Sequence, residues 1–259
     1  MENTFIEVKS NGVVSAKQGS NGRSPYEHQR KAMECLDIID KLDDYSTLVV
    51  LPTGGGKTYT ASSWLLKAAL NKHKKILWIA HRQTLLDQAA ESFQKFAYAE
   101  NMPNVSSFKY RIVSGSTDHD RTIDIVGTDN LLIASKDSLG RNLQALDSWA
   151  KGEKEVYLVI DEAHHSTAKT YRKVIDYVKS NVSHVKIIGL TATPFRTADS
   201  EQGLLAKIYT DGVNLGKPVK DNKGITYKID LKILINRSIL SRPIFESYST
   251  EEGFGNNLG

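Results

Sequence analysis

The chain has 259 residues, 40% of them hydrophobic and 25% charged, and this ordinary globular composition excludes wholesale disorder, collagen-like repeats and long coiled coils. Its 34 Lys and Arg against 30 Asp and Glu give a formal charge of +4, which allows a polyanionic partner without indicating one. A single cysteine excludes an internal disulfide and a zinc site built from several cysteines.

The N-terminal stretch has no signal-peptide pattern, because no apolar run follows a basic segment there. Apolar runs elsewhere, such as residues 47–51, are far shorter than the roughly 20 residues needed to cross a bilayer. We therefore expect a soluble cytoplasmic protein without a membrane partner. Residues 1–22 are polar and rich in Gly, Ser and Asn, which predicts a flexible arm.

Regular structure is expected to begin with a helix. Ser24, Pro25 and Glu27 have the pattern of a capping box with proline at the first helical position. Apolar residues then recur at helical spacing as far as Lys41.

Beyond this helix, short continuous apolar runs alternate with stretches of helical periodicity. The apolar runs, which are typical of buried strands, are 47–51, 76–80, 131–134, 156–160 and 185–190. The helical stretches are about 58–71, 83–99, 136–150 and 168–180. This alternation predicts an α/β fold with a parallel sheet covered by helices on both faces.

The pattern weakens after about residue 198, where glycine, proline and Asp-Asn segments punctuate the sequence. One further apolar run, 229–235, is expected to be a last strand. We therefore expect one domain over residues 23–215, followed by a connecting segment and tail over 216–259.

A glycine-rich loop joins the first expected strand to the helix after it. Glycines let backbone N–H groups turn toward phosphate oxygens, and the helix presents its positive N-terminus. Lys57 would reach the β- and γ-phosphates of a triphosphate, and the Thr58 hydroxyl would hold Mg²⁺. The general phosphate-loop pattern has glycine where this chain has Leu51. The predicted nucleotide-binding residues of the loop are Thr53, Gly54, Gly55, Gly56, Lys57 and Thr58.

Two carboxylates, Asp161 and Glu162, directly follow the strand expected at 156–160. They are therefore expected at the carboxyl edge of the sheet, where parallel sheets bind ligands. Asp161 would hold Mg²⁺, and Glu162 would orient and deprotonate the attacking water. We predict Lys57, Asp161 and Glu162 as the catalytic residues.

His164 and His165 lie just beyond the acid pair. Adjacent side chains on a turn are expected to diverge, and no cysteine or suitably spaced histidine completes a ligand set. The sequence therefore predicts no transition-metal site at these two residues.

In order along the chain, these motifs resemble the first RecA-like, ATP-binding lobe of a superfamily 2 helicase. The similarity is to the DEAH-containing group that includes restriction-enzyme motor subunits such as type III Res, and Leu51 is normal in that group. The matching segments are 25–29 (PYEHQ), 51–58 (LPTGGGKT), 79–82 (IAHR), 132–139 (LIASKDSL), 161–164 (DEAH) and 191–194 (TATP). They belong to a resemblance that runs over about residues 23–242.

The resemblance implies a function for residues outside the phosphate loop and the acid pair. Gln29 would read the edge of adenine, because its side-chain amide both donates and accepts hydrogen bonds. The side chains that would couple hydrolysis to the nucleic-acid face are His164, Thr191 and Thr193.

The resemblance also implies a nucleic-acid partner that is bound without sequence specificity. Arg82 would contact a backbone phosphate, and Ser135 and Ser138 would add further backbone contacts. The resemblance favours DNA over RNA, because the Gly-Gly-Gly loop and the His81-Arg82 pair are similar to the restriction-motor group.

Motors of this superfamily need a second RecA-like lobe, which carries an arginine finger. Phosphoryl transfer without that arginine is slower by about 10³–10⁵. The residues after the 191–194 motif are too few for such a lobe, and 234–243 resembles the inter-lobe segment. We therefore expect a single lobe that hydrolyses ATP weakly. It would be a truncated product, an isolated piece, or a subunit whose partner supplies a second lobe, a nuclease or a methyltransferase.

Two other functions account for part of the sequence. A phosphate-loop kinase or transporter ATPase would explain segment 51–58, but those groups lack the 191–194 motif and Gln29. A catalytically weak nucleotide- or nucleic-acid-binding module that acts through a partner stays open, because the sequence shows no arginine-finger motif of a second lobe.

Overall fold

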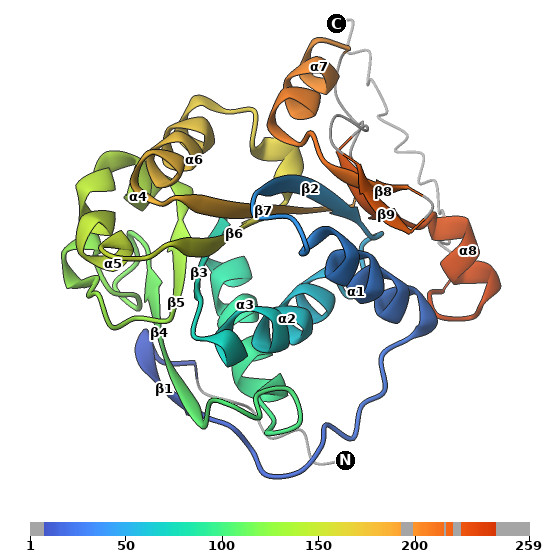
Figure 1. Ribbon diagram of the computed structural model, residues 1–259, viewed down its shortest axis with the longest axis horizontal. Helices are drawn as coiled ribbons and strands as arrows, with labels where there is room; N and C mark the ends of the chain where they lie inside the picture. Colours follow the sequence, from blue (N-terminus) through green and yellow to red (C-terminus); the bar gives the residue numbers. More distant parts are fainter. Residues whose placement is uncertain (1–7, 193–198, 215, 220–223, 242–259) are drawn as a thin grey trace, which may run out of the picture.

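A mostly parallel sheet of eight strands runs through the molecule, in the order β1-β4-β5-β3-β6-β7-β2-β10 (Figure 1). The computed structural model describes residues 8–192, 199–214, 216–219 and 224–241. The strands of the sheet are β1 Asn11–Ser15, β2 Tyr45–Val50, β3 Lys75–Ala80, β4 Ser107–Val113, β5 Leu131–Ser135, β6 Glu155–Asp161, β7 His184–Thr191 and β10 Ile225–Lys228. Only β1, at one edge, runs antiparallel to its neighbour, β4.

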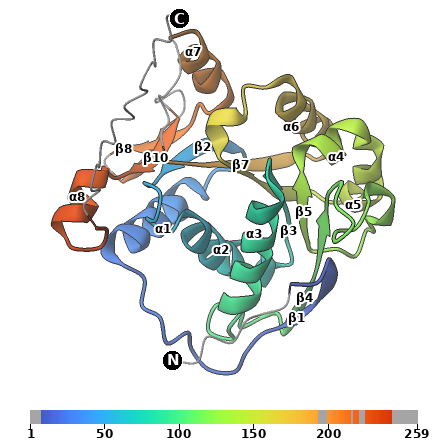
Figure 2. The ribbon, with the colours of Figure 1, turned by 180° about the vertical axis from the view of Figure 1, so that it is seen from behind.

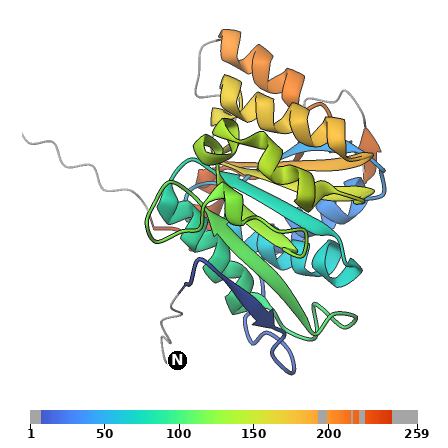
Figure 3. The same cartoon turned by 90° about the vertical axis from the view of Figure 1, so that its left-hand side faces the viewer.

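Helices cover both faces of the sheet, as the side view in Figure 3 shows. One face packs against α1 Glu27–Ile39, α2 Lys57–Ala68 and α3 Gln83–Phe96. The other packs against α4 Lys136–Arg141, α5 Asp147–Ala150 and α6 Lys169–Asn181. In Figure 2, seen from behind, α1, α2 and α3 lie together. The parallel α/β sheet predicted from the sequence is therefore confirmed.

The central strands are continuous apolar runs because each face of the sheet is buried. In β2, Val49 belongs to the core under α1, α2 and α3, whereas Leu48 and Val50 belong to the core under the opposite helices. Strands buried on both faces have no polar side to alternate with the apolar one.

Three predictions made for particular segments are wrong. The apolar run 229–235 is not a strand: β10 ends at Lys228, and Leu231–Asn236 is the helix α8. Leu231 and Ile233 are exposed while Leu234 is buried, and such a short run does not distinguish strand from helix by its pattern. The stretch 136–150 is likewise broken, because α4 ends before Asn142 and a 3-10 turn (η3, Leu143–Leu146) separates it from α5.

The third wrong prediction concerns the start of α1. The helix begins at Glu27 with Tyr26 as N-cap, so Ser24 does not cap it. The Tyr26 N–H donates to Gln29 Oε1 at 3.0 Å, so Gln29 takes the place expected for the glutamate. Glu27 instead pairs with Lys31 at 2.7 Å and with Arg237 at 2.8 Å.

Strand β1 lies within the segment expected to be a flexible arm. Val14 is buried against the sheet while Val13 is 61% exposed. Two adjacent valines among polar residues give no clear period, and only pairing with β4 makes this segment a strand.

The region after residue 198 contains more regular structure than its glycines and prolines indicate. It holds helix α7 (Asp199–Ile208) and the antiparallel pair β8 (Gly212–Asn214) and β9 (Lys217–Val219). Across the whole described part of the chain, none of the helices is long and apolar enough to cross a bilayer.

Candidate functional site

The candidate site lies at the carboxyl edge of four neighbouring parallel strands, β3, β6, β7 and β2. The phosphate loop follows β2, Asp161 ends β6, and Thr191 ends β7 between them. This strand order brings together residues that are far apart in the sequence. Ligands of open parallel sheets bind in the crevice outside this edge.

The phosphate loop has the backbone conformation that its glycines permit. Gly54 and Gly56 have φ angles of 80° and 82°, in the left-handed region that side chains rarely adopt. A Cβ on Gly56 would also clash with Gln29 Nε2. Helix α2 starts at Lys57, immediately after this turn. The loop therefore places backbone amides around the start of a helix, and this cradle fits a phosphate group.

Helix α1 is fastened to the phosphate loop by two side chains. His28 Nε2 lies 2.9 Å from the Gly55 carbonyl oxygen, and Gln29 Nε2 donates to the same oxygen at 3.1 Å. Gln29 is 2% exposed, and both ends of its amide are engaged, since Oε1 accepts from Tyr26. Gln29 therefore holds the loop, and its expected contact with adenine stays a prediction.

The two acidic residues differ in their surroundings. Asp161 is buried at the end of β6, and its Oδ1 accepts a hydrogen bond from the Glu162 N–H at 2.9 Å. Glu162 has φ 53°, a left-handed conformation that is uncommon for a non-glycine residue. This turn directs Glu162 toward Lys57, so that Oε1 lies 4.0 Å from Nζ. Strained backbone of this kind concentrates at functional sites.

Burial raises the pKa of Asp161 to about 6, and the nearby negative charge of Glu162 adds to the shift. Lys57 and the hydrogen bond from the Glu162 amide act in the opposite direction. The folded chain therefore binds a proton at Asp161 more tightly than the unfolded chain does. The stability that this gives is present below the ordinary pKa of 3.8 and is lost as the pH rises through about 6.

Replacing Asp161 with asparagine is therefore expected to stabilise the chain at about pH 7.5 in EDTA, by about 1–3 kcal/mol. Asparagine keeps the acceptor for the Glu162 amide and removes the buried charge. Thermal unfolding of the parent and Asp161→Asn measures this as a higher Tm, by about 2–4 °C per kcal/mol. The difference in Tm between Asp161→Asn and the parent should become smaller at about pH 4.5, where Asp161 of the parent is protonated. A variant less stable than the parent at about pH 7.5 would contradict this account of the buried carboxylate.

The structure describes two of the three residues expected to couple hydrolysis to the nucleic-acid face, His164 and Thr191. His164 Nδ1 lies 3.3 Å from Glu162 Oε2 and 3.2 Å from Thr191 Oγ1, so it bridges the ends of β6 and β7. Thr193 lies outside the described residues. The role of these residues in coupling stays a prediction.

The residues expected to contact nucleic acid lie at the same edge, after β3 and β5. Arg82 is exposed at the N-cap of α3. Ser135 and Ser138 are buried: Ser135 Oγ accepts from the Ser138 N–H at 3.2 Å and caps α4, and the two hydroxyls are 2.9 Å apart. Their hydroxyls are thus engaged in the cap, and nucleic-acid contact by all three residues stays a prediction.

Sequence reasoning missed the contact of His81 with the two histidines beside the acid pair. The rings of His164 and His165, expected to diverge, lie 4.2 Å apart in a 3-10 turn (η4, Ala163–His165). His81, which follows β3, places its ring 4.6 Å from that of His165. No group of three His, Cys, Asp or Glu residues in the described ranges has an arrangement that could hold a metal ion.

It also missed the contact between the segment after β10 and the phosphate loop. A Cβ on Gly54 would lie 2.9 Å from Leu240 Cδ2, and one on Gly55 would lie 3.5 Å from Leu234 Cδ1. Arg237 of the same segment pairs with Glu27 of α1. Residues 231–241 therefore pack beside the loop, and no local signal in the sequence indicates this long-range contact.

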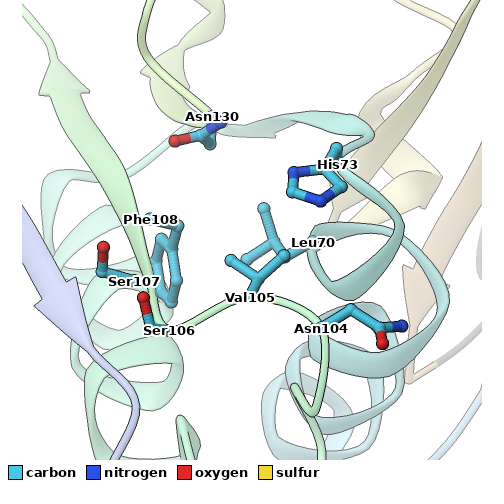
Figure 4. Close-up of a pocket in the computed structure, with 8 residues that line it drawn as sticks. All are labelled: Leu70, His73, Asn104, Val105, Ser106, Ser107, Phe108 and Asn130. Atoms are coloured by element: carbon cyan, nitrogen blue, oxygen red, sulfur yellow. The ribbon is translucent and has the colours of Figure 1, made fainter.

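A cavity at the opposite edge of the sheet does not contribute to this site. Its volume is about 230 Å³, and His73, Ser107 and Asn130, among others, line it at the amino ends of β3, β4 and β5 (Figure 4).

Known proteins resemble this chain in sequence and in fold. A sequence model for the family described as "Type III restriction enzyme, res subunit" matches residues 23–196, more than half of the chain. The structure of a nuclease-deletion mutant of the Type ISP restriction-modification enzyme LlaGI, in complex with a DNA substrate mimic, has a similar fold. The TM-score is 0.51 and the identity 16%, over 84% of this chain and 21% of that one.

Two curated proteins are similar in sequence. The putative ATP-dependent helicase IRC3 of Saccharomyces cerevisiae is 33% identical over 159 residues, which is 58% of this chain and 20% of IRC3. The Type I restriction enzyme EcoAI endonuclease subunit of Escherichia coli is 32% identical over 189 residues, 68% of this chain and 20% of that subunit. The chain therefore spans about a fifth of the length of each.

Proposed function

This chain belongs to the family of the type III restriction enzyme res subunit, and we propose that it forms the ATP-binding lobe of a DNA-dependent helicase or translocase. The observation that carries this proposal is the approach of Lys57, on the phosphate loop, to Glu162, on the neighbouring acidic turn. Phosphoryl transfer needs a positive group at the phosphates and a residue that positions the nucleophile. Titration with ATP, with and without Mg²⁺, tests the proposal.

Each residue of the site has a distinct part in the proposed reaction. The loop amides and Lys57 would bind the phosphates. The Thr58 hydroxyl and the Asp161 carboxylate are oxygen ligands of the kind that Mg²⁺ prefers, and they would hold it. Bound Mg²⁺ would offset the negative charge of the phosphates. Glu162 would accept a proton from the attacking water.

We propose that this lobe hydrolyses ATP slowly without a partner that supplies an arginine. Within the described ranges, Glu162 lies near Lys57 and His164, and no hydrogen bond or ion pair joins Asp161 or Glu162 to an arginine. A missing arginine finger lowers the rate of phosphoryl transfer by about 10³–10⁵. The alternative function is a catalytically weak nucleotide- or nucleic-acid-binding module that acts through a partner.

The nucleic-acid face would lie along the carboxyl edge beside the ATP site. Arg82 would contact a backbone phosphate, and Ser135 and Ser138 would hold the start of α4 at this face. His164, Thr191 and Thr193 would couple it to Glu162. The DNA substrate mimic in the LlaGI structure, a protein of similar fold, supports DNA as the partner.

Replacing Arg82 with alanine is expected to weaken DNA binding by about three- to tenfold, equally for DNA of different sequences. The logarithm of the binding constant falls with the logarithm of the salt concentration, and the variant should reduce the magnitude of this slope by about 1, as expected for the loss of one phosphate contact. Fluorescence anisotropy with two unrelated DNA duplexes, measured over a salt series, tests both effects.

The matched control for this measurement is Arg172→Ala. Arg172 is also an exposed arginine on a helix, but α6 covers one face of the sheet and its residues do not belong to the proposed DNA edge. An equal loss of DNA affinity in both variants would show that Arg82 contributes only to the net charge of the chain. That result would contradict its proposed contact with a backbone phosphate.

A further inference from the structure

Three histidine rings form a row along the carboxyl edge of the sheet. His81 follows β3, and His164 and His165 lie in η4 after β6, the strand next to β3. The ring of His165 lies in the middle, 4.6 Å from His81 and 4.2 Å from His164 between centroids. At these distances the rings are in direct packing contact.

The row joins the two proposed binding regions. At one end, His81 is bonded through the backbone to Arg82, the exposed N-cap of α3. At the other end, His164 Nδ1 lies 3.3 Å from the carboxylate of Glu162. The row is therefore a continuous line of contacts from the proposed phosphate contact to the proposed general base.

His81 is held in this row by packing. Its Nδ1 is buried and has no hydrogen-bond partner within the described residues. A buried polar atom without a hydrogen-bond partner destabilises the fold, so an apolar side chain would serve a purely structural purpose better. Burial, together with the nearby charges of His165 and Arg82, lowers the pKa of His81 and favours its neutral, packed form.

We propose that His81 and His165 are positioning residues that transmit the binding of DNA at Arg82 to the carboxylate of Glu162. This proposal rests on the proposed function of the lobe. A phosphate bound by Arg82 displaces the start of α3 and, with it, His81. Because the His165 ring packs between His81 and His164, the displacement reaches the side chain that contacts Glu162.

If the histidine row transmits DNA binding to Glu162, the binding of DNA and the binding of nucleotide should be energetically coupled. Coupling is reciprocal, so nucleotide bound beside Glu162 must change the affinity for DNA by the same factor as DNA changes the affinity for nucleotide. Binding measurements therefore test the transmission even where hydrolysis is slow.

The experiment measures the Kd for a fluorescein-labelled DNA duplex with and without a saturating non-hydrolysable ATP analogue and Mg²⁺. The parent chain is expected to show a ratio of the two Kd values of about fivefold or more. His165→Ala should bring the ratio close to one and leave each separate affinity within about twofold of the parent. His165→Phe keeps a ring in the row and should retain most of the coupling. His184→Ala, at the amino end of β7, is the control and should match the parent.

Three results would overturn the proposal: a parent ratio of one although both ligands bind, an unchanged ratio in His165→Ala, or loss of coupling in His165→Phe as well as His165→Ala. His165 is exposed, so its truncation leaves the core intact, and the retained affinities report a folded chain. A parent chain that binds no nucleotide is a different result, since it rejects the proposed function itself.

Discussion

Replacing Lys57 with alanine is expected to weaken ATP binding by about 100-fold or more. The Nζ group would make charge-assisted hydrogen bonds to two phosphates, each contributing about 1.5–3 kcal/mol. A loss of about 3 kcal/mol corresponds to about 100-fold in Kd. Titration of the parent and Lys57→Ala with ATP and Mg²⁺ measures this loss directly.

A second lysine on the same helix provides the control. Lys67 lies in the last turn of α2 and is exposed, far along the helix from the phosphate loop. Lys67→Ala removes the same charge and should bind ATP like the parent. If Lys57→Ala also bound like the parent, the loop would not be the phosphate site. Circular dichroism of both variants excludes unfolding as the cause of lost binding.

Replacing Glu162 with glutamine is expected to separate hydrolysis from binding. A general base contributes about 10²–10⁴ to the rate, so the slow hydrolysis expected of this lobe should fall below detection. Binding should be retained or become tighter, because a negative charge beside the phosphates is removed. Single-turnover hydrolysis and nucleotide titration, carried out on the same preparation, measure the two effects.

The control for this variant is Glu91→Gln, on the exposed side of α3. It removes an equal charge away from the site and should leave both binding and hydrolysis unchanged. Hydrolysis by Glu162→Gln at the rate of the parent would show that another group activates the water. Loss of ATP binding would assign Glu162 a part in holding the nucleotide.

The positions of the central strands along the chain could be predicted because each buried strand is a continuous apolar run bounded by polar residues. The same reasoning placed Lys57 and Asp161 at one edge of the sheet. It failed where tertiary contacts decide the local structure: Asn11–Ser15 becomes a strand only by pairing with β4, and Leu231–Asn236 becomes a helix by burying Leu234 alone.

The proposed site likewise contains residues that the sequence predicts and contacts that only the fold creates. Lys57, Asp161 and Glu162 belong to short motifs whose residue types predict phosphate binding, Mg²⁺ binding and proton transfer. The contacts of His81 with His165 and of Leu240 with Gly54 join residues that are distant in sequence, and no motif predicts that they meet. Gln29 combines the two cases, since its motif predicts adenine recognition while the fold engages its amide at Gly55 and Tyr26.

The central claim, a single site for ATP and Mg²⁺ at the carboxyl edge, is tested most directly by calorimetric titration of the chain with ATP. With Mg²⁺ present, we expect saturable binding of one ATP per chain, and with EDTA in place of Mg²⁺ or with Asp161→Asn, binding at least about tenfold weaker. Binding of equal strength in all three cases, or no binding in any of them, would contradict the claim.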